Sequence, residues 1–358
     1  MKLAGERQGA SRALAAGVGA AGLAALAAGL LPIFAKQAYA AGGAPIAVAM
    51  ARTVLAAGLL WCIHLLFLRR HLAIYPFALG ACLVAGAING VGSLLFYVGL
   101  SRVDASLAQL LFTLHVIFLT VFSWLDGHRL TWLTALRLGL GVLAVALLKW
   151  TGTSDLDWTS AIMLVAAGGL YALHIFINQR TLYDVPAPTV TLYTLTGMAV
   201  TVFIGYVAVG LPALPAEPTG WVPLILLTVF TLAQRLTLFL GVKELGGPQT
   251  ILLNLSEALV TILAAALLLG ESLTAGQWAG AGVLAASLWL LTREEHLGNL
   301  PRPRPWVQLF ASLYHTLTGG AERAGARAHD LPGREPTPSP EIAVETEPAE
   351  PEVLELKH

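Results

Sequence analysis

Ionisable side chains inside long apolar stretches are the part of this sequence that could do chemistry. Glu257, Arg235 and Arg52 each lie in a run of residues with almost no other charge. Such a group costs free energy unless it faces a partner or water. Glu257 is suited to hold an amine or a proton, and Arg235 to hold an anionic group. Arg52 could attract anions too, or it could reach out to the surface or cap backbone carbonyls.

Uncharged polar residues accompany these charges at helical spacing. Three sets share the spacing i, i+3, i+7: Tyr171, His174 and Asn178; Thr228, Thr231 and Arg235; and Asn254, Glu257 and Thr261. Each set forms a stripe on one face of a helix, and that face should point inward. Together they predict a wet internal cavity, although hydrogen bonds between packed helices would explain a single histidine or asparagine equally well.

The elements that position these residues must lie in a membrane. Of the 358 residues, 56% are hydrophobic and 12% are charged, against about 25% charged in a soluble protein. The mean hydropathy is +0.73 and the formal net charge is zero. These values exclude an ordinary soluble domain, and nothing in them favours nucleic-acid binding.

Motifs for catalysis and metal binding are missing from the sequence. It contains no HExxH, no GxSxG and no phosphate-binding Gly-Lys loop. The two cysteines, Cys62 and Cys82, lie in apolar segments with no CxxC pattern. We therefore expect a protein that is not an enzyme and that uses no metal or cofactor.

Ten apolar segments follow one another along the chain. They are 13–35, 45–68, 77–100, 103–125, 131–149, 158–180, 189–211, 221–243, 248–269 and 275–292. Each is long enough to cross a ~30 Å hydrocarbon core as a helix. In a single lipid-exposed segment only a helix pairs all backbone N–H and C=O groups, so an all-α membrane protein of ten helices is predicted. Gly86 and Gly90, four residues apart, could let two of these helices approach closely.

Basic residues near the segment ends predict the orientation. With a cytoplasmic N-terminus, eleven lysines and arginines face the cytoplasm and three face outward. Both termini should therefore be cytoplasmic, and residues 1–12 should form a short cytoplasmic N-terminal segment. Ala38-Tyr39-Ala40 resembles a signal-peptidase site, but the apolar run before it is longer than a usual signal core, so we expect the first segment to be retained.

The composition changes after Thr292. Residues 293–328 contain an apolar stripe from Trp306 to Leu317 between arginines, which predicts a helix lying in the headgroup region or packed on the membrane body. Residues 329–358 are rich in proline and glutamate and are predicted to be disordered.

A weak internal repeat divides the membrane part into 13–149 and 158–292. Gly99 and Leu110-Leu111 recur about 142 residues later as Gly241 and Leu252-Leu253. An offset of five helices makes the halves inverted, and inverted repeats place a transport site near the midplane. The repeat sets His115 in the place of Glu257. We expect both residues, with Asn89, near one central cavity.

Several motifs resemble the EamA type of the drug/metabolite transporter superfamily. They are Pro45 to Arg52, Tyr97-Val98-Gly99-Leu100, Ala105-Ser106-Leu107-Ala108, Leu255-Ser256-Glu257-Ala258, and Leu269-Gly270-Glu271-Ser272-Leu273-Thr274 followed by Gln277 and Gly280. The resemblance covers roughly 13–292 and implies ten helices as two inverted five-helix repeats. It also implies a site role for Lys36, which lies where the family often has a first-helix lysine.

The function implied by the resemblance is a membrane carrier. Exporters of amino acids or related metabolites are common among EamA-type proteins, so we expect such a carrier, working by alternating access in the plasma (inner) membrane. Its partners would be a small-molecule substrate and the lipid bilayer, without nucleic acid; a homodimer is left open. The alternatives are a membrane-embedded enzyme and a receptor or scaffold acting through its cytoplasmic tail.

Overall fold

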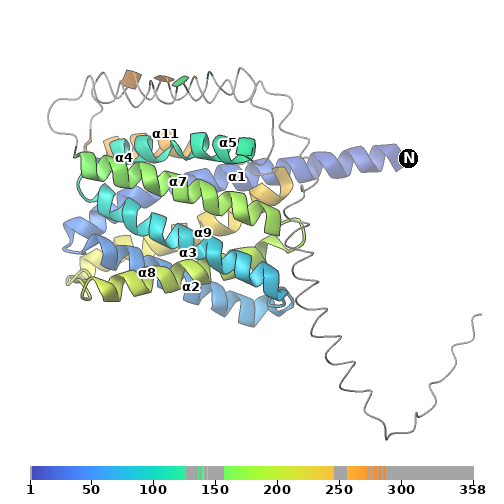
Figure 1. Ribbon diagram of the computed structural model, residues 1–358, viewed down its shortest axis with the longest axis horizontal. Helices are drawn as coiled ribbons and strands as arrows, with labels where there is room; N and C mark the ends of the chain where they lie inside the picture. Colours follow the sequence, from blue (N-terminus) through green and yellow to red (C-terminus); the bar gives the residue numbers. More distant parts are fainter. Residues whose placement is uncertain are drawn as a thin grey trace, which may run out of the picture. The chain divides into compact units, whose positions relative to one another are not determined.

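The computed structural model in Figure 1 describes residues 2–125, 157–245 and 256–271, and single positions between 136 and 286. For residues 2–15 it describes the backbone only. Every regular element in these residues is helical. The elements are α1 (Lys2–Ala40), α2 (Pro45–Phe67), η1 (Arg69–His71), α3 (Pro76–Leu100), α4 (Ala105–Phe112), α5 (His115–Leu125), α7 (Trp158–Thr181), α8 (Ala187–Ala208), α9 (Pro218–Leu245) and α11 (Ser256–Leu268).

Seven helical stretches in the described residues are long and apolar enough to cross a membrane, and they coincide with seven of the ten predicted segments. They are Ala16–Ala40, Pro45–Phe67, Pro76–Leu100, Ala105–Phe122, Trp158–Thr181, Ala187–Ala208 and Pro218–Glu244. The segment 248–269 is represented by the shorter α11. Most of 131–149 and 275–292, and the whole tail from 293, lie outside the described residues, so the count of ten stays a prediction.

The predicted segment 103–125 is not one continuous helix. It breaks at Thr113 and Leu114, between α4 and α5. The Leu114 N–H donates to Leu111 O at 3.3 Å and the Val116 N–H to Thr113 O at 3.3 Å, so the turn tightens to i→i−3 bonds. The Thr113 hydroxyl also donates to Gln109 O at 2.7 Å, and such a bond to the preceding turn bends a helix. The break ends α4 beside the centre of the bundle.

Prolines and one acidic cap set the helix starts. Pro45 and Pro76 begin α2 and α3, where a missing N–H costs nothing. Asp157 caps α7 by accepting from the Thr159 N–H at 3.1 Å and from the Ser160 hydroxyl. The bond from Ser160 is the main reason that the pKa of Asp157 lies below its ordinary value, and the Thr159 N–H and Arg102 add to it.

The connecting turns gather at two ends of the helices. At one end the Ala44 N–H donates to Ala213 O at 2.9 Å, and Arg102 pairs with Asp157 at 3.5 Å. At the other end Thr189 donates to His71 O at 2.8 Å. Successive helices therefore run in alternate directions, as membrane-spanning helices with short connections must.

The strongest helix packing joins the first half of the chain to the second. α1 packs on α9 and α11, α2 packs on α8 and α9, and α3 lies between α7 and α8 (Figure 1). The Thr261 hydroxyl donates to Gly29 O at 2.8 Å, so α1 is tied into the bundle. Retention of the first segment stays a prediction.

Large apolar side chains cover the outside of the helices. Examples are Leu55, Leu59 and Leu66 of α2; Val200, Phe203 and Ile204 of α8; and Leu259, Leu263 and Leu267 of α11. Soluble monomers rarely expose so much contiguous apolar surface. Hydrocarbon is the environment that suits these faces.

Helices α3 and α8 meet through glycines. A Cβ added at Gly86 would collide with the carbonyl oxygen of Thr194, and one at Gly197 would lie 2.6 Å from Leu83 O. Gly90 faces Thr201 of the same helix α8. Because the obstructing atoms include backbone, neither helix can give way cheaply. The predicted close approach at Gly86 and Gly90 therefore occurs between α3 and α8.

Gly86→Ala should destabilise the purified protein by about 1–3 kcal/mol, the usual cost of overpacking. Gly80→Ala, in the same helix, is the matched control, since an added Cβ there meets open space. It should be neutral or slightly stabilising, because alanine favours helix by about 1 kcal/mol. Thermal unfolding in detergent measures both variants. Equal unfolding temperatures for the two would contradict the proposed α3–α8 contact.

Candidate functional site

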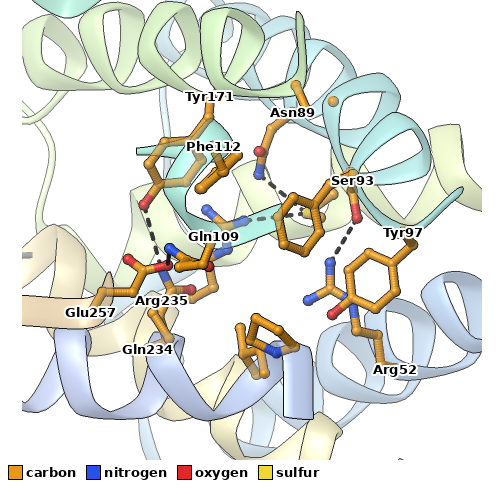
Figure 2. Close-up of a pocket in the computed structure, with 17 residues that line it drawn as sticks. Arg52, Asn89, Ser93, Tyr97, Gln109, Phe112, Tyr171, Gln234, Arg235 and Glu257 are labelled. Carbon is orange, nitrogen blue, oxygen red and sulfur yellow. Dashed lines mark hydrogen bonds between the residues drawn. The ribbon is translucent and has the colours of Figure 1, made fainter. Parts of the chain in front are cut away.

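A cavity lies among eight helices, and both halves of the chain line it (Figure 2). The lining residues are Ala28, Leu31 and Pro32 of α1; Arg52 of α2; Asn89, Gly92, Ser93, Phe96 and Tyr97 of α3; Gln109 and Phe112 of α4; Ala167 and Tyr171 of α7; Met198 of α8; Gln234 and Arg235 of α9; and Glu257 of α11. The cavity has a volume of ≈ 60 Å³.

Arg235 enters the cavity from α9 and is held by neutral groups. Its Nη1 donates to His174 Nε2 at 3.2 Å. With the Asn89 amide oxygen turned toward it, Asn89 accepts from Nη1 at 3.2 Å and from Nη2 at 2.7 Å. A guanidinium only donates, so His174 Nε2 must accept, while its Nδ1 lies against Tyr171 O and must donate. His174 is therefore neutral and orients the arginine.

Arg52 enters the same cavity from α2. Its Nη1 donates to the Thr231 hydroxyl at 3.0 Å and its Nη2 to the Ser93 hydroxyl at 2.7 Å. The guanidinium carbon lies 4.4 Å from the centre of the Tyr97 ring, a cation–π distance. Arg52 thus joins α2, α3 and α9 without a charged partner among these contacts.

Glu257 supplies a carboxylate from the first turn of α11. Gln109 Nε2 donates to Glu257 Oε1 at 2.9 Å, which joins α4 of the first half to α11 of the second. In the part of the chain that the structure describes, Glu257 forms no ion pair with a lysine or arginine. The carboxylate is therefore free to accept a hydrogen bond from a ligand.

The charges on the cavity do not balance. Arg52, Arg235 and Glu257 are 4%, 6% and 6% exposed, and the described residues offer neither guanidinium a carboxylate within ion-pair distance. Two cations and one carboxylate leave a net charge of +1 when all three are ionised. A buried guanidinium without a counter-charge is costly, and an anionic ligand would relieve that cost.

Aromatic rings form the apolar wall of the cavity. The ring centres of Phe96 and Phe112 lie 4.9 Å apart, and those of Phe112 and Tyr171 lie 5.2 Å apart. Such walls around a few polar groups are typical of small-molecule sites. The arrangement suits a compact ligand with a short carbon skeleton and charged ends.

The sequence model of one family, described as the EamA-like transporter family, matches residues 15–150 and again 158–293. The chain belongs to the EamA-like transporter family. The two matches cover the two halves whose helices interleave around the cavity. A solved crystal structure also matches, with a TM-score of 0.58 at 14% identity over 77% of this chain and 98% of that one, which shows similarity of fold alone. No curated protein matches.

Membership in the family indicates a multi-pass membrane transporter for a small molecule, which fits the expectation that the protein is not an enzyme. The apolar helices and their exposed apolar faces agree with that assignment. The cavity between the two halves is therefore the place to look for the substrate.

Five predicted site residues of this EamA-type protein line the cavity: Glu257, Asn89, Arg235, Tyr171 and Arg52. His174 lies behind Arg235 and bonds it. Asn178 does not line the cavity; its Oδ1 accepts from Thr194 Oγ1 at 3.0 Å, which ties α7 to α8. Asn254 lies outside the described residues.

Two other predicted residues lie away from the cavity. His115 is buried, its Nδ1 lies 2.9 Å from Phe112 O, and its ring packs on Phe112 and Tyr171. It stands behind the aromatic wall, because α4 has already ended at Phe112. Lys36 is half-buried and outside the lining, within electrostatic range of Glu271 and Asp104.

Sequence reasoning did not propose Gln109, Gln234, Ser93 or Tyr97 as site residues. Ser93 and Tyr97 follow Asn89 at i+4 and i+8, so one face of α3 carries a polar and aromatic stripe that could have been found. Gln109 is a lone amide in an apolar helix, and no periodicity marks it. Its role depends on the break that follows it.

Proposed function

We propose that this protein exports an amino acid or a closely related zwitterionic metabolite by alternating access. The proposal rests on two groups that lie on one buried cavity. One is the Glu257 carboxylate, which forms no ion pair in the described residues, and the other is the Arg235 guanidinium, which its neighbours already orient. A zwitterion presents the two complementary charges. Dicationic or uncharged substrates would leave the guanidinium without a partner.

Binding would use both ends of the substrate. Glu257 accepts hydrogen bonds from the amine, while Gln109 holds the carboxylate in place. Arg235 receives the substrate carboxylate, and His174 and Asn89 keep its guanidinium oriented. Charge-assisted hydrogen bonds of this kind are stronger than neutral ones, which favours a charged substrate over water.

Alternating access would act on the bonds that join the two halves. The bonds Gln109–Glu257 and Arg52–Thr231 each join a residue of the first half to a residue of the second. At one end of the bundle the Glu271 carboxylate accepts from the backbone N–H groups of Ala105 and Ser106 at 2.8 and 3.0 Å, and so caps α4 from the other half. Opening that end requires breaking this cap, and closing it re-forms the cap.

We place the protein in the plasma (inner) membrane with both termini cytoplasmic. Arg69, Arg70, Arg180 and Lys243 belong to the end where α2 and α7 finish, whereas Lys36 and Arg102 belong to the opposite end. This distribution supports the positive-inside orientation. Reporter fusions at Gly42 and Pro215 should read external; internal readings at both would reverse the orientation.

The direct cellular test compares amino acids inside and outside cells with and without overexpression of the protein. Export predicts that at least one amino acid rises in the medium and falls in the cells. Cells that express Glu257→Gln at the same level serve as the control and should resemble cells without the protein. Unchanged pools with abundant, correctly inserted protein would count against export of amino acids.

A further inference from the structure

Arg52 provides the cavity with a second buried guanidinium that a simple amino acid would leave unused. An amine on Glu257 and a carboxylate on Arg235 already account for both charges of a zwitterion. Arg52 lines the same cavity, where Glu257 is the one carboxylate among the described lining residues, and the two form no ion pair.

The contacts of Arg52 do not fit the structural roles that the sequence left open. The side chain is 4% exposed, so it does not reach out to the surface. Its bonds go to the hydroxyls of Thr231 and Ser93 rather than to backbone carbonyls. A guanidinium has more N–H donors than these two bonds use, and its Nε has no partner in the described residues. Arg52 is thus oriented but not neutralised.

Charge balance selects the substrate class. The cavity carries +1 from Arg52, Arg235 and Glu257 together, and a neutral zwitterion leaves that +1 unchanged. A substrate with one amine and two carboxylates carries −1 and brings the sum to zero. Uncompensated charge is costly in a buried site, so the balanced complex is favoured.

Arg52 and Arg235 lie among different residues of the cavity, so they can bind different parts of one ligand. Figure 2 shows Arg52 beside Tyr97 and Ser93, whereas Arg235 lies toward Glu257 and Gln234 on the other side of the cavity. A substrate that carries two anionic groups can engage both guanidiniums.

We propose that Arg52 binds a second anionic group of the substrate, so that the transported class is amino acids with an acidic side chain. This inference rests on the proposed function and narrows its substrate. Aspartate and asparagine, or glutamate and glutamine, are probes that differ by one negative charge at nearly equal size. The wild type should therefore prefer the acidic member of each pair.

The experiment measures uptake of radiolabelled L-aspartate and L-asparagine by liposomes that contain the purified full-length protein and trapped unlabelled amino acid. The wild-type ratio of kcat/KM should favour aspartate by about tenfold or more, the size expected for one charge-assisted interaction. Arg52→Gln should lower that ratio by about tenfold, and Arg52→Lys should give an intermediate ratio. Arg70→Gln, which removes an exposed guanidinium, should keep the wild-type ratio.

The outcomes separate this inference from the proposed function. If the wild type carries asparagine and glutamine as well as their acids, the inference is wrong while amino-acid transport stands. An unchanged ratio in a folded Arg52→Gln protein likewise overturns it. If the wild type carries none of the four probes and no other amino acid, the proposed function fails and the inference fails with it. The wild-type ratio decides the matter even if both Arg52 variants unfold.

Discussion

Glu257→Gln is expected to lower the transport rate by about 10–100-fold, the range that corresponds to one hydrogen bond to a charged group. The glutamine keeps the size of the side chain, and its carbonyl oxygen can still accept from Gln109 Nε2. The change removes only the charge, and with it the carboxylate that the cavity offers to an amine. Uptake by proteoliposomes over a range of pH measures the effect.

The matched control is Glu244→Gln, which removes an exposed carboxylate near the end of α9. It should transport at the wild-type rate. If Glu257 only ties the halves together through Gln109, the glutamine variant would keep both its stability and its transport. An unchanged rate and an unchanged pH dependence would remove Glu257 from the list of substrate and proton ligands.

Arg235→Lys is expected to raise the KM for the substrate by about 10–100-fold, although the positive charge remains. A lysine ammonium is a point charge without the planar fork of a guanidinium, so it cannot bond His174 and Asn89 and still present two parallel donors to a carboxylate. Arg235→Gln, which also removes the charge, should lose more. Initial rates at several substrate concentrations distinguish the two variants.

Asn89→Asp separates a binding role of Arg235 from a structural one. The new carboxylate would stand in the place of the amide that lies 2.7–3.2 Å from the guanidinium, and so would supply the missing counter-charge from within the protein. Thermal stability should hold or rise while transport falls. A variant with wild-type transport would show that Arg235 does not need its charge for the substrate.

Sequence reasoning located the helices well because hydrocarbon leaves the backbone few choices. Seven apolar segments coincide with described helices, since each must satisfy its backbone internally. The break at Thr113 and Leu114 was not predicted. It depends on a hydroxyl bond to Gln109 O and on the packing around α4, and neither changes the hydropathy of the segment.

The same argument explains which site residues were predicted. Glu257 and Arg235 were found because a buried charge has few uses other than binding. An uncharged polar residue indicates a binding site less clearly than a charged one, because the rotation of its helix decides where its side chain points. Tyr171 reaches the cavity, whereas Asn178, on the same predicted stripe, bonds Thr194 instead.

The repeat argument illustrates the limit of symmetry. It set His115 in the place of Glu257, but α4 ends at Phe112 and His115 packs behind the aromatic wall. The residue that donates a hydrogen bond to Glu257 is Gln109, which lies six positions before His115. The same family model matches both halves, yet a local helix break changes which side chain reaches the centre of the bundle.

Counterflow in proteoliposomes tests the central claim most directly. Liposomes with trapped unlabelled amino acids are exposed to a mixture of isotopically labelled amino acids, and the labelled molecules inside are followed by mass spectrometry. The account predicts that at least one labelled amino acid accumulates transiently above its external concentration, with a saturable initial rate, and only when wild-type protein and trapped amino acid are both present. Accumulation no greater than in empty liposomes, or a flux that rises linearly without saturation, would contradict a carrier for amino acids.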